Sequence, residues 1–519
     1  MADQKKKKSF FLFRWLKRGV AGNDGEIRDI LREEQVQTPF KTMAKAFFHK
    51  RTAMVGVVVF LIIFVVVIVG PYIWKLDLSD QDSTMSNIPP GYNLMKVPGE
   101  MKGHVRDIAA GGTYGIGIDD SGRIHIWGHT RITDKLDIAN VPDEVQNANI
   151  SMIAAGEDHA VALAEDGQVY VWGNTRLKQG ELSKEMKAAM KDPATWNVIQ
   201  LEASNQFSAI VTSDGKAYFW GNGNMSDIKV RKEYQGNIQK VALTSNEYIA
   251  LLRDGTVAYT GKNYKTSPFA VIPEGLNGKN IAATSKTVAA VTEDGQVFMW
   301  GNARSGEADI PAFSAPIKSI SGGRFHYTVL LEDGSVVSWG SNKYGQTSVP
   351  SSLKGRNITA VYTGNFQNYA VDDANHVYTW GLKGFLLGTD NLGRDMLTRI
   401  INGGRVTMTV GAISVVIATI IGVLLGGLAG YFGGKADILI MRISEIVGGL
   451  PFIPFAMILS AVIGASIDAT HRMYIIMVVL GVLSWTGTCR LVRAQILAQR
   501  EMEYVTAAKA MGIKEMAIV

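Results

Sequence analysis

The sequence contains little cysteine and little charge. One cysteine, Cys489, stands among 519 residues, so a disulfide framework of the kind that holds small secreted domains is excluded. Charged residues make up 19% of the chain and hydrophobic residues 47%, a composition that excludes a disordered chain. The phosphate-loop motif GxxxxGKS/T and the HExxH and GxSxG motifs are all missing. We therefore expect neither ATP hydrolysis nor a catalytic, cofactor or metal site in this chain.

Long apolar runs are missing from residues 75–404 but occur on both sides of that stretch. The first, from Thr52 to Trp74, has 23 residues without a charge, which at about 1.5 Å per residue crosses a hydrocarbon core of about 30 Å. About fifty residues precede this run, which argues against a signal peptide. We expect four spans, at about 53–74, 406–432, 440–467 and 473–497.

Lysine and arginine collect before the first expected span. Thirteen of them precede Thr52, which predicts a cytoplasmic segment 1–52 and places the middle of the chain outside the membrane, after a linker at 75–103. Four spans then return the chain to the side on which Arg490, Arg493 and Arg500 lie. A nucleic-acid-binding or targeting tail is the alternative interpretation. We favour a multi-pass protein of the cell membrane, in contact with lipid and without a nucleic-acid partner.

Residues 104–385 repeat a short pattern seven times. Each copy has a small-residue segment, an apolar run, a turn that is usually Asp-Gly, and a second run that usually ends in Trp-Gly. The closing glycines are 45, 48, 40, 40, 39 and 41 residues apart. They are Gly128, Gly173, Gly221, Gly261, Gly301, Gly340 and Gly381.

This pattern predicts β-structure. Two alternating runs joined by Asp-Gly indicate a hairpin with a two-residue type I′ turn, and a single hairpin cannot bury its apolar face. A period near 40, read as four short strands per unit, predicts a seven-bladed propeller. We expect the tryptophans to pack between blades and His159 and His326 to be structural rather than metal ligands. The expected fold class is mixed: a polytopic α-helical membrane domain interrupted by an extracytoplasmic all-β seven-bladed propeller at 104–385.

The repeats resemble the regulator-of-chromosome-condensation type of propeller. The copies EDGQVYVWG, EDGQVFMWG and EDGSVVSWG carry the resemblance, and the fourth copy, RDGTVAYTG, has Thr260 where tryptophan is expected. The resemblance implies the fold. The chromatin and GTPase partners of that family are not expected here, because the orientation argument places this domain outside the membrane.

The flanks resemble the C-type permease subunits of ATP-binding-cassette importers for dipeptides and oligopeptides. The resemblance rests on GTDNLGRDMLTRIINGGRVTMTVG, LAGYFGGKADILIMRISEIVGGLPFIPFAMIL and EYVTAAKAMG, and on TPFKTMAKAFFHKRTAMVGVVVF near the N-terminus. It implies one permease domain that the propeller interrupts between its first and second helices. The partners it implies are a second permease subunit, two ATP-binding subunits that bind the ATP, and an extracytoplasmic substrate-binding protein.

Within this resemblance, residues 503–512 match the cytoplasmic coupling helix that docks on the ATPase subunit. The implied coupling residues are Glu503, Tyr504, Ala507, Ala508 and Gly512. Thr506 departs from the family's usual Glu-Ala-Ala. An ordinary amphipathic helix at the membrane surface is the alternative.

Two further groups are candidates on physical grounds. Gly422, Gly426 and Gly430 form overlapping small-xxx-small repeats, which predict close helix packing. Pro451 and Pro454 interrupt the third expected span and free carbonyl groups to line a path or bend with gating.

Related permeases continue into two further spans beyond the coupling helix, so we expect the domain 386–519 to be truncated. The expected function is that of a permease subunit for peptides, with nickel as another substrate class. The alternative is a membrane-anchored propeller that serves as a binding or sensing module.

Overall fold

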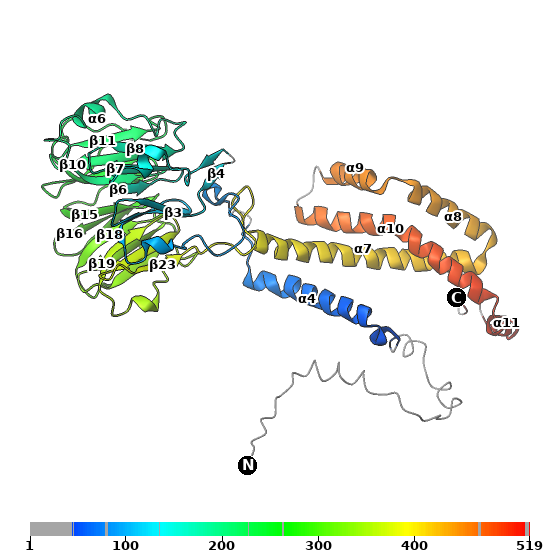
Figure 1. The fold of residues 1–519 in the computed structure, drawn as a ribbon. Helices are drawn as coiled ribbons and strands as arrows, with labels where there is room; N and C mark the ends of the chain where they lie inside the picture. The colour runs from blue at the N-terminus through cyan, green and yellow to red at the C-terminus, as the bar shows by residue number, and fades with distance from the viewer. Residues whose placement is uncertain are drawn as a thin grey trace, which may run out of the picture. The chain divides into compact units, whose positions relative to one another are not determined.

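The computed structural model describes residues 44, 46–77, 81–133, 135–226, 228–261, 264–464, 469–513 and 518. The chain divides into two compact units, which Figure 1 shows as a group of sheets and a group of helices. We call residues 77–397 the sheet domain, and residues 1–76 with 398–519 the helical unit. Most of the basic segment predicted at 1–52 lies outside the described residues.

The sheet domain contains seven three-stranded antiparallel sheets, each formed by three strands consecutive in sequence. The strands are β1 Val105–Ala110, β2 Tyr114–Asp119 and β3 Ile124–Gly128; β6 Ile150–Ala155, β7 His159–Ala164 and β8 Val169–Gly173; β9 Val198–Ala203, β10 Phe207–Thr212 and β11 Ala217–Gly221; β12 Ile238–Leu243, β13 Tyr248–Leu252 and β14 Val257–Tyr259; β15 Gly278–Ala283, β16 Thr287–Thr292 and β17 Val297–Gly301; β18 Ile317–Gly322, β19 His326–Leu331 and β20 Val336–Gly340; and β21 Ile358–Thr363, β22 Gln367–Asp372 and β23 Val377–Gly381. A separate pair is formed by β4 Arg131–Thr133 and β5 Leu136–Asp137.

The expectation of four strands per unit was wrong. In six of the seven sheets the third strand ends at a glycine with positive φ, for example +93° at Gly173 and +110° at Gly301. This conformation turns the chain out of the sheet. The connecting segments then form short helices and turns in place of a fourth strand. The short helices are α5 Asp143–Gln146, α6 Lys184–Ala189, η3 Pro268–Ala270 and η4 Ser351–Leu353.

The turn type also differs from the prediction. In the second sheet Ala164 and Gln168 bracket a three-residue loop, and the N–H of Gly167 donates to the carbonyl of Ala164 at 2.9 Å. Gly167 alone has positive φ in this loop, whereas a type I′ turn needs positive φ at both central residues. Asp166 contributes differently, because its carboxylate accepts the N–H of Gln168 at 2.9 Å. Glu165 and Asp166 are therefore the central residues of a type I turn, which the left-handed Gly167 closes.

The tryptophans that end the third strands are buried at the junctions between sheets. Trp172 packs in a cluster with Tyr114 and Ile116 of the first sheet, and its indole N–H donates to the carbonyl of Ile138 at 2.9 Å. The first and seventh sheets also contact each other. Trp127 Nε1 donates to the hydroxyl of Tyr369 at 2.9 Å, and the Asn365 N–H donates to the Gly111 carbonyl at 3.2 Å.

The two ends of the sheet domain pair with each other. The leading segment contains η1 Ser83–Met85 and η2 Gly99–Met101. The Asp82 N–H donates to Leu392 O at 3.1 Å, and the Asn87 N–H donates to Asp390 O at 3.0 Å. The segment that leads into the domain and the segment that leaves it are thus joined by backbone hydrogen bonds.

The helical unit contains α4 Arg51–Ile73, α7 Met396–Phe432, α8 Gly434–Gly449, α9 Phe452–Gly464, α10 Ala469–Arg500 and α11 Glu503–Ala510. Among the described residues, α4, α7 and most of α10 are long and apolar enough to cross a membrane. The pair α8 and α9 gives a fourth candidate span, bent by 82°. Near the junction of α4 and α7, an added Cβ on Gly70 would lie 2.5 Å from Ile401 Cγ2, so these two helices pack closely there.

Candidate functional site

The residues of the implied coupling helix lie in and just after α11. Glu503, Tyr504 and Ala507 are exposed and Ala508 is half-buried, while Val505 on the same helix is buried. Gly512 ends the segment with φ of +78°, a conformation that favours glycine. The helix thus presents one side to solvent and anchors the other.

Two side-chain contacts fix α11 to its neighbours. The Tyr504 hydroxyl donates to Gln499 Oε1 of α10 at 2.5 Å. The Lys509 ammonium lies 4.9 Å from the centre of the Tyr431 ring in α7, within the range of a cation–π interaction. Both contacts join the short helix to long ones, α10 and α7.

The three spaced glycines of α7 face α10. An added Cβ would lie 2.6 Å from the Thr488 side chain at Gly422, 2.6 Å from the Cys489 carbonyl oxygen at Gly426, and 2.8 Å from the Arg493 carbonyl oxygen at Gly430. Contacts this short leave no room for a side chain. Close approach of the two backbones is the physical use of small-xxx-small spacing in membrane helices.

The two prolines take different positions. Pro451 lies between α8 and α9, after Leu450 in an extended conformation with φ of −69° and ψ of 132°. A residue before proline is kept out of the helical region, which explains the break there. Pro454 lies in the first turn of α9, where the missing N–H costs no intrahelical hydrogen bond. Pro451 thus accounts for the bend between α8 and α9, and Pro454 is compatible with α9, the helix that contains it.

The sequence did not predict one ion pair of the helical unit. Arg493 in α10 donates from Nη2 to Asp437 Oδ2 in α8 at 2.6 Å, and a second hydrogen bond joins Nε to Oδ1. Arg490, one turn earlier, donates to the Ser444 carbonyl at 3.5 Å. The available signal was Asp437, an acidic residue at the edge of an apolar segment. Such a residue in a membrane protein calls for a partner, but its partner lies 56 residues away.

The sheet domain has a central cavity of about 230 Å³, lined by the first strand of each sheet. Asp107 precedes the lining residue Ile108 on β1 and does not itself line the cavity. Burial raises its pKa to about 6, against hydrogen bonds from the Ile108 N–H and Tyr362 that lower it. Burial also raises the pKa of Glu202 and lowers that of Lys240, while the opposite charges of these two residues counteract both shifts. The cavity is therefore polar and contains both signs of charge.

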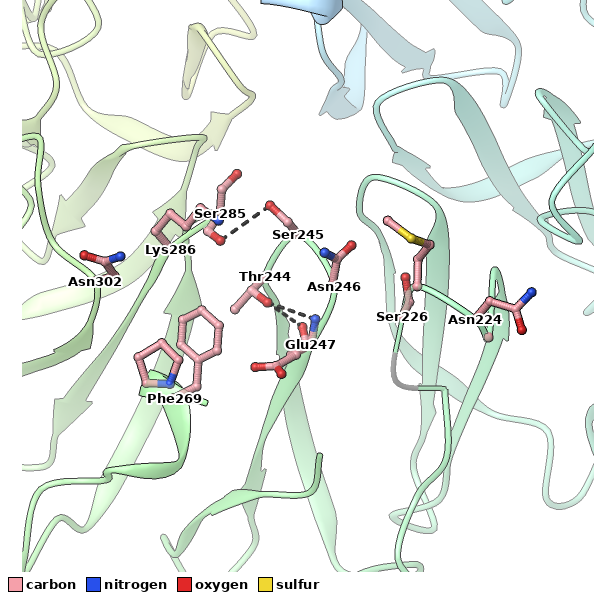
Figure 2. Close-up of a pocket in the computed structure, with 13 residues that line it drawn as sticks. Asn224, Ser226, Thr244, Ser245, Asn246, Glu247, Phe269, Ser285, Lys286 and Asn302 are labelled. Atoms are coloured by element: carbon pink, nitrogen blue, oxygen red, sulfur yellow. Dashed lines mark hydrogen bonds between the residues drawn. The ribbon is translucent and has the colours of Figure 1, made fainter. Parts of the chain in front are cut away.

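A second cavity, of about 470 Å³, opens at the fourth sheet. Figure 2 shows the turn Thr244–Glu247 between Asn224 and Ser226 on one side and Lys286 and Asn302 on the other. The Ser245 hydroxyl donates to the Ser285 carbonyl at 3.4 Å, and Thr244 Oγ1 accepts the Glu247 N–H at 3.0 Å. Its volume lies in the range of small-ligand sites, about 300–1,000 Å³.

His159 and His326 are fully buried and lie at equivalent positions of two sheets. His159 Nε2 lies 2.8 Å from Ser208 Oγ, and His326 Nε2 donates to Asn368 Oδ1 at 3.0 Å. Among the described residues, no group of three or more His, Cys, Asp or Glu side chains is arranged to hold a metal ion.

Comparison with known protein families gives three matches. Residues 422–519 match the inner membrane component of binding-protein-dependent transport systems, and residues 38–90 match the N-terminal transmembrane domain of oligopeptide transport permease C. Both models describe parts of the membrane subunits of binding-protein-dependent importers. Residues 150–179 and 317–346 match the regulator of chromosome condensation repeat. The two resemblances inferred from the sequence are confirmed, and the helical unit carries the sequence of a multi-pass membrane protein.

Curated relatives agree with the permease match. The dipeptide transport system permease protein DppC of Bacillus subtilis is 40% identical over 132 residues, which is 25% of this chain and 39% of the relative. The oligopeptide transport system permease protein OppC of Haemophilus influenzae is 37% identical over 132 residues, 25% of this chain and 40% of the relative. The chain thus spans about two fifths of the length of these permeases.

Solved structures similar to the sheet domain are more distant. Prp20p of Saccharomyces cerevisiae is 19% identical with a TM-score of 0.37, covering 50% of this chain and 75% of that one. The ectodomain of the Arabidopsis thaliana receptor kinase ACR4 is 18% identical with a TM-score of 0.40, covering 52% and 91%. Neither likeness bears on function.

Proposed function

We propose that this chain is the permease subunit of an ATP-driven importer for dipeptides or oligopeptides. The observation that carries the proposal is the pair of matches at 38–90 and 422–519, which lie on opposite sides of the seven repeats at 104–385 and describe importer permeases. Both relatives named above transport peptides according to their names. Peptides are therefore favoured over nickel as the substrate class.

In this proposal residues 53–74 and 386–519 form one transport domain, and the sheet domain is a seven-bladed propeller inserted between its first two helices. Contact between the first and seventh sheets supports ring closure. The excess of lysine and arginine before α4 supports a cytoplasmic N-terminus, hence an extracytoplasmic propeller in the cell membrane. A second permease subunit and a substrate-binding protein complete the translocation path.

The proposed coupling to ATP hydrolysis runs through α11. Glu503, Tyr504 and Ala507 are exposed for docking on an ATPase subunit, and Val505 and Lys509 tie the helix to the rest of the unit. Two copies of that ATPase bind the nucleotide. The close packing at Gly426 holds α7 and α10 together, and the bend at Pro451 supplies a break in the path.

The test is uptake of a radiolabelled dipeptide by cells that express the full chain with the other subunits of its importer. Ala507→Arg is expected to reduce uptake at least about tenfold, because a large cation replaces a small residue at a packed docking surface. It should also weaken co-purification of the ATPase subunit. Ala312→Arg, the same substitution at an exposed alanine of the sheet domain, is the control and should retain uptake.

A second arm removes residues 104–385. Uptake that survives makes the propeller an accessory of the permease. A full chain that folds in the membrane with its partners and transports no peptide contradicts the proposal and favours the membrane-anchored binding module.

A further inference from the structure

The fourth repeat departs from the other six at one place. Its third strand, β14, has three residues, whereas the third strands of the other sheets have five and end at the closing glycine. Gly261 lacks the positive φ that the other six closing glycines adopt. Thr260 replaces tryptophan beside it, and this threonine is buried with a hydroxyl that has no hydrogen-bond partner among the described residues.

The tryptophans of neighbouring repeats make a contact that Thr260 does not make. In neighbouring repeats the tryptophan reaches the segment that precedes its own sheet: Trp300 Nε1 donates to Phe269 O at 3.0 Å, and Trp339 Nε1 donates to Glu307 O at 2.9 Å. Thr260 is too short to make the equivalent contact. Residues 223–226, which precede the fourth sheet, line the cavity of about 470 Å³.

The carboxylate of Glu247 lines this cavity, at the strand position that lies opposite the closing glycine. Glu247 aligns with the residues that pair with the closing glycine in other sheets, such as Phe207 and Thr287, both fully buried. Ser267 Oγ donates to Glu247 Oε2 at 2.6 Å, and the Tyr259 hydroxyl donates to Oε1 at 3.1 Å. Each oxygen keeps acceptor capacity for a further donor.

The structure shows two hydrogen bonds to the Glu247 carboxylate but no positively charged partner among the described residues. No ion pair to Glu247 is present within the part of the chain that the structure describes. Lys286 also lines the cavity, on the side that Figure 2 shows opposite Asn224. Phe269 and Met225 add apolar surface. A cavity with an oriented carboxylate, a separate ammonium and apolar walls complements a small zwitterion that also carries apolar groups.

We propose that this cavity binds a short peptide with free termini, with its amino group on Glu247 and its carboxylate toward Lys286. The identity of the ligand as a peptide rests on the proposed function, whereas the cavity and its charges do not. The site would hold peptide on the sheet domain itself, in addition to any separate binding protein.

The experiment is isothermal titration of the full chain in lipid nanodiscs. The probes are trialanine, N-acetyl-trialanine, trialanine amide and maltotriose. We expect trialanine to bind, and Glu247→Gln to weaken it about tenfold or more, since the lost hydrogen bond is charge-assisted. Acetylation of the amino terminus should cost a similar factor in the unsubstituted protein and little further in the Glu247→Gln variant. Lys286→Gln should selectively remove the preference for trialanine over its amide.

The control is Glu332→Gln, at an exposed glutamate of another sheet, which should bind trialanine unchanged. The inference is wrong if trialanine does not bind, if acetylated peptide binds equally well, or if maltotriose binds in its place. Uptake separates the two proposals: binding without uptake contradicts only the transport function, and uptake without binding contradicts only this site.

Discussion

Arg493 of α10 binds both carboxylate oxygens of Asp437 of α8, through its Nε and Nη2 atoms. Both side chains are less than one third exposed, at 32% and 19%. A bidentate arginine–carboxylate pair is stronger and more directional than a single ion pair. It joins α8 to α10 beside the hydrogen bond from Arg490 to the Ser444 carbonyl, and so restricts the rotation of the two helices as well as their distance.

Replacing this pair should loosen the helical unit. We expect Asp437→Asn to reduce the free energy of unfolding by about 1–3 kcal/mol, because it weakens two charge-assisted hydrogen bonds. Thermal unfolding of the full chain in nanodiscs measures the change. Arg442→Gln is the control, since Arg442 pairs with Glu445 at 2.8 Å on an exposed surface and exposed pairs contribute at most about 1 kcal/mol. Equal effects of the two substitutions would contradict the assignment.

The glycines of α7 allow a test with a neighbouring control. Gly426→Ala places a methyl group 2.6 Å from the Cys489 carbonyl oxygen, whereas a Cβ on Gly427 meets no atom within 4 Å. Both substitutions gain about 1 kcal/mol of helix propensity, so their difference isolates the contact with α10. We expect Gly426→Ala to lower the unfolding temperature and Gly427→Ala to leave it unchanged or raise it. If Gly427→Ala lowered the unfolding temperature as much as Gly426→Ala, the contact between Gly426 and α10 would not explain the effect.

Contact between the first and seventh sheets predicts a cost for removing one hydroxyl. Tyr369→Phe leaves the buried Trp127 N–H without its acceptor, which should cost about 1–3 kcal/mol. The matched control is Tyr92→Phe, at a tyrosine that is 64% exposed. Calorimetry of the full chain follows the sheet-domain transition. An unchanged transition in Tyr369→Phe would show that this contact does not stabilise the domain.

His326 predicts a loss of stability in acid. Burial lowers its pKa from 6.5 to about 4, against the hydrogen bond to Asn368 that raises it. The unfolded chain therefore binds a proton more readily. The stability that the neutral ring contributes is present above about pH 6.5 and is lost as the pH falls towards 4, by up to about 3 kcal/mol.

Comparison with His326→Gln isolates this effect. Asp107 acts in the opposite direction, because its raised pKa favours the folded state at lower pH. The difference in unfolding free energy between the parent protein and the variant should therefore be followed from pH 7 to pH 4, and it should shrink as the pH falls. A difference that is constant with pH would contradict the prediction.

Sequence reasoning succeeded where a feature depends on nearby residues. The repeat period, the Asp-Gly turns and the apolar length of α4 all follow from local patterns. It erred on the strand count and the turn type, because each depends on the backbone angle of one residue. Gly173 ends the third strand with a φ of +93°, and in the turn before it Gly167 alone has positive φ. A glycine permits that angle, and its neighbours decide whether it is used. Gly261 illustrates the point, since it closes the same pattern without a positive φ.

Candidate residues divide in the same way. The sequence alone singled out Gly422, Gly426 and the residues around Glu503, through spacing and family resemblance. It did not indicate that Asp437 meets Arg493, or that Glu247 faces a cavity, because these relations join segments far apart in the chain.

The sequence by itself determined the elements: membrane-length helices from uncharged apolar runs, and seven similar β-units from a pattern near 40 residues long. Both follow from backbone preference and from the burial of apolar side chains. Only the tertiary structure decided which elements meet. Trp127 contacts Tyr369 across 242 residues of sequence, and Glu247 and Lys286 of two neighbouring sheets line the same cavity. Such contacts depend on the closure of the whole domain, which no local pattern encodes.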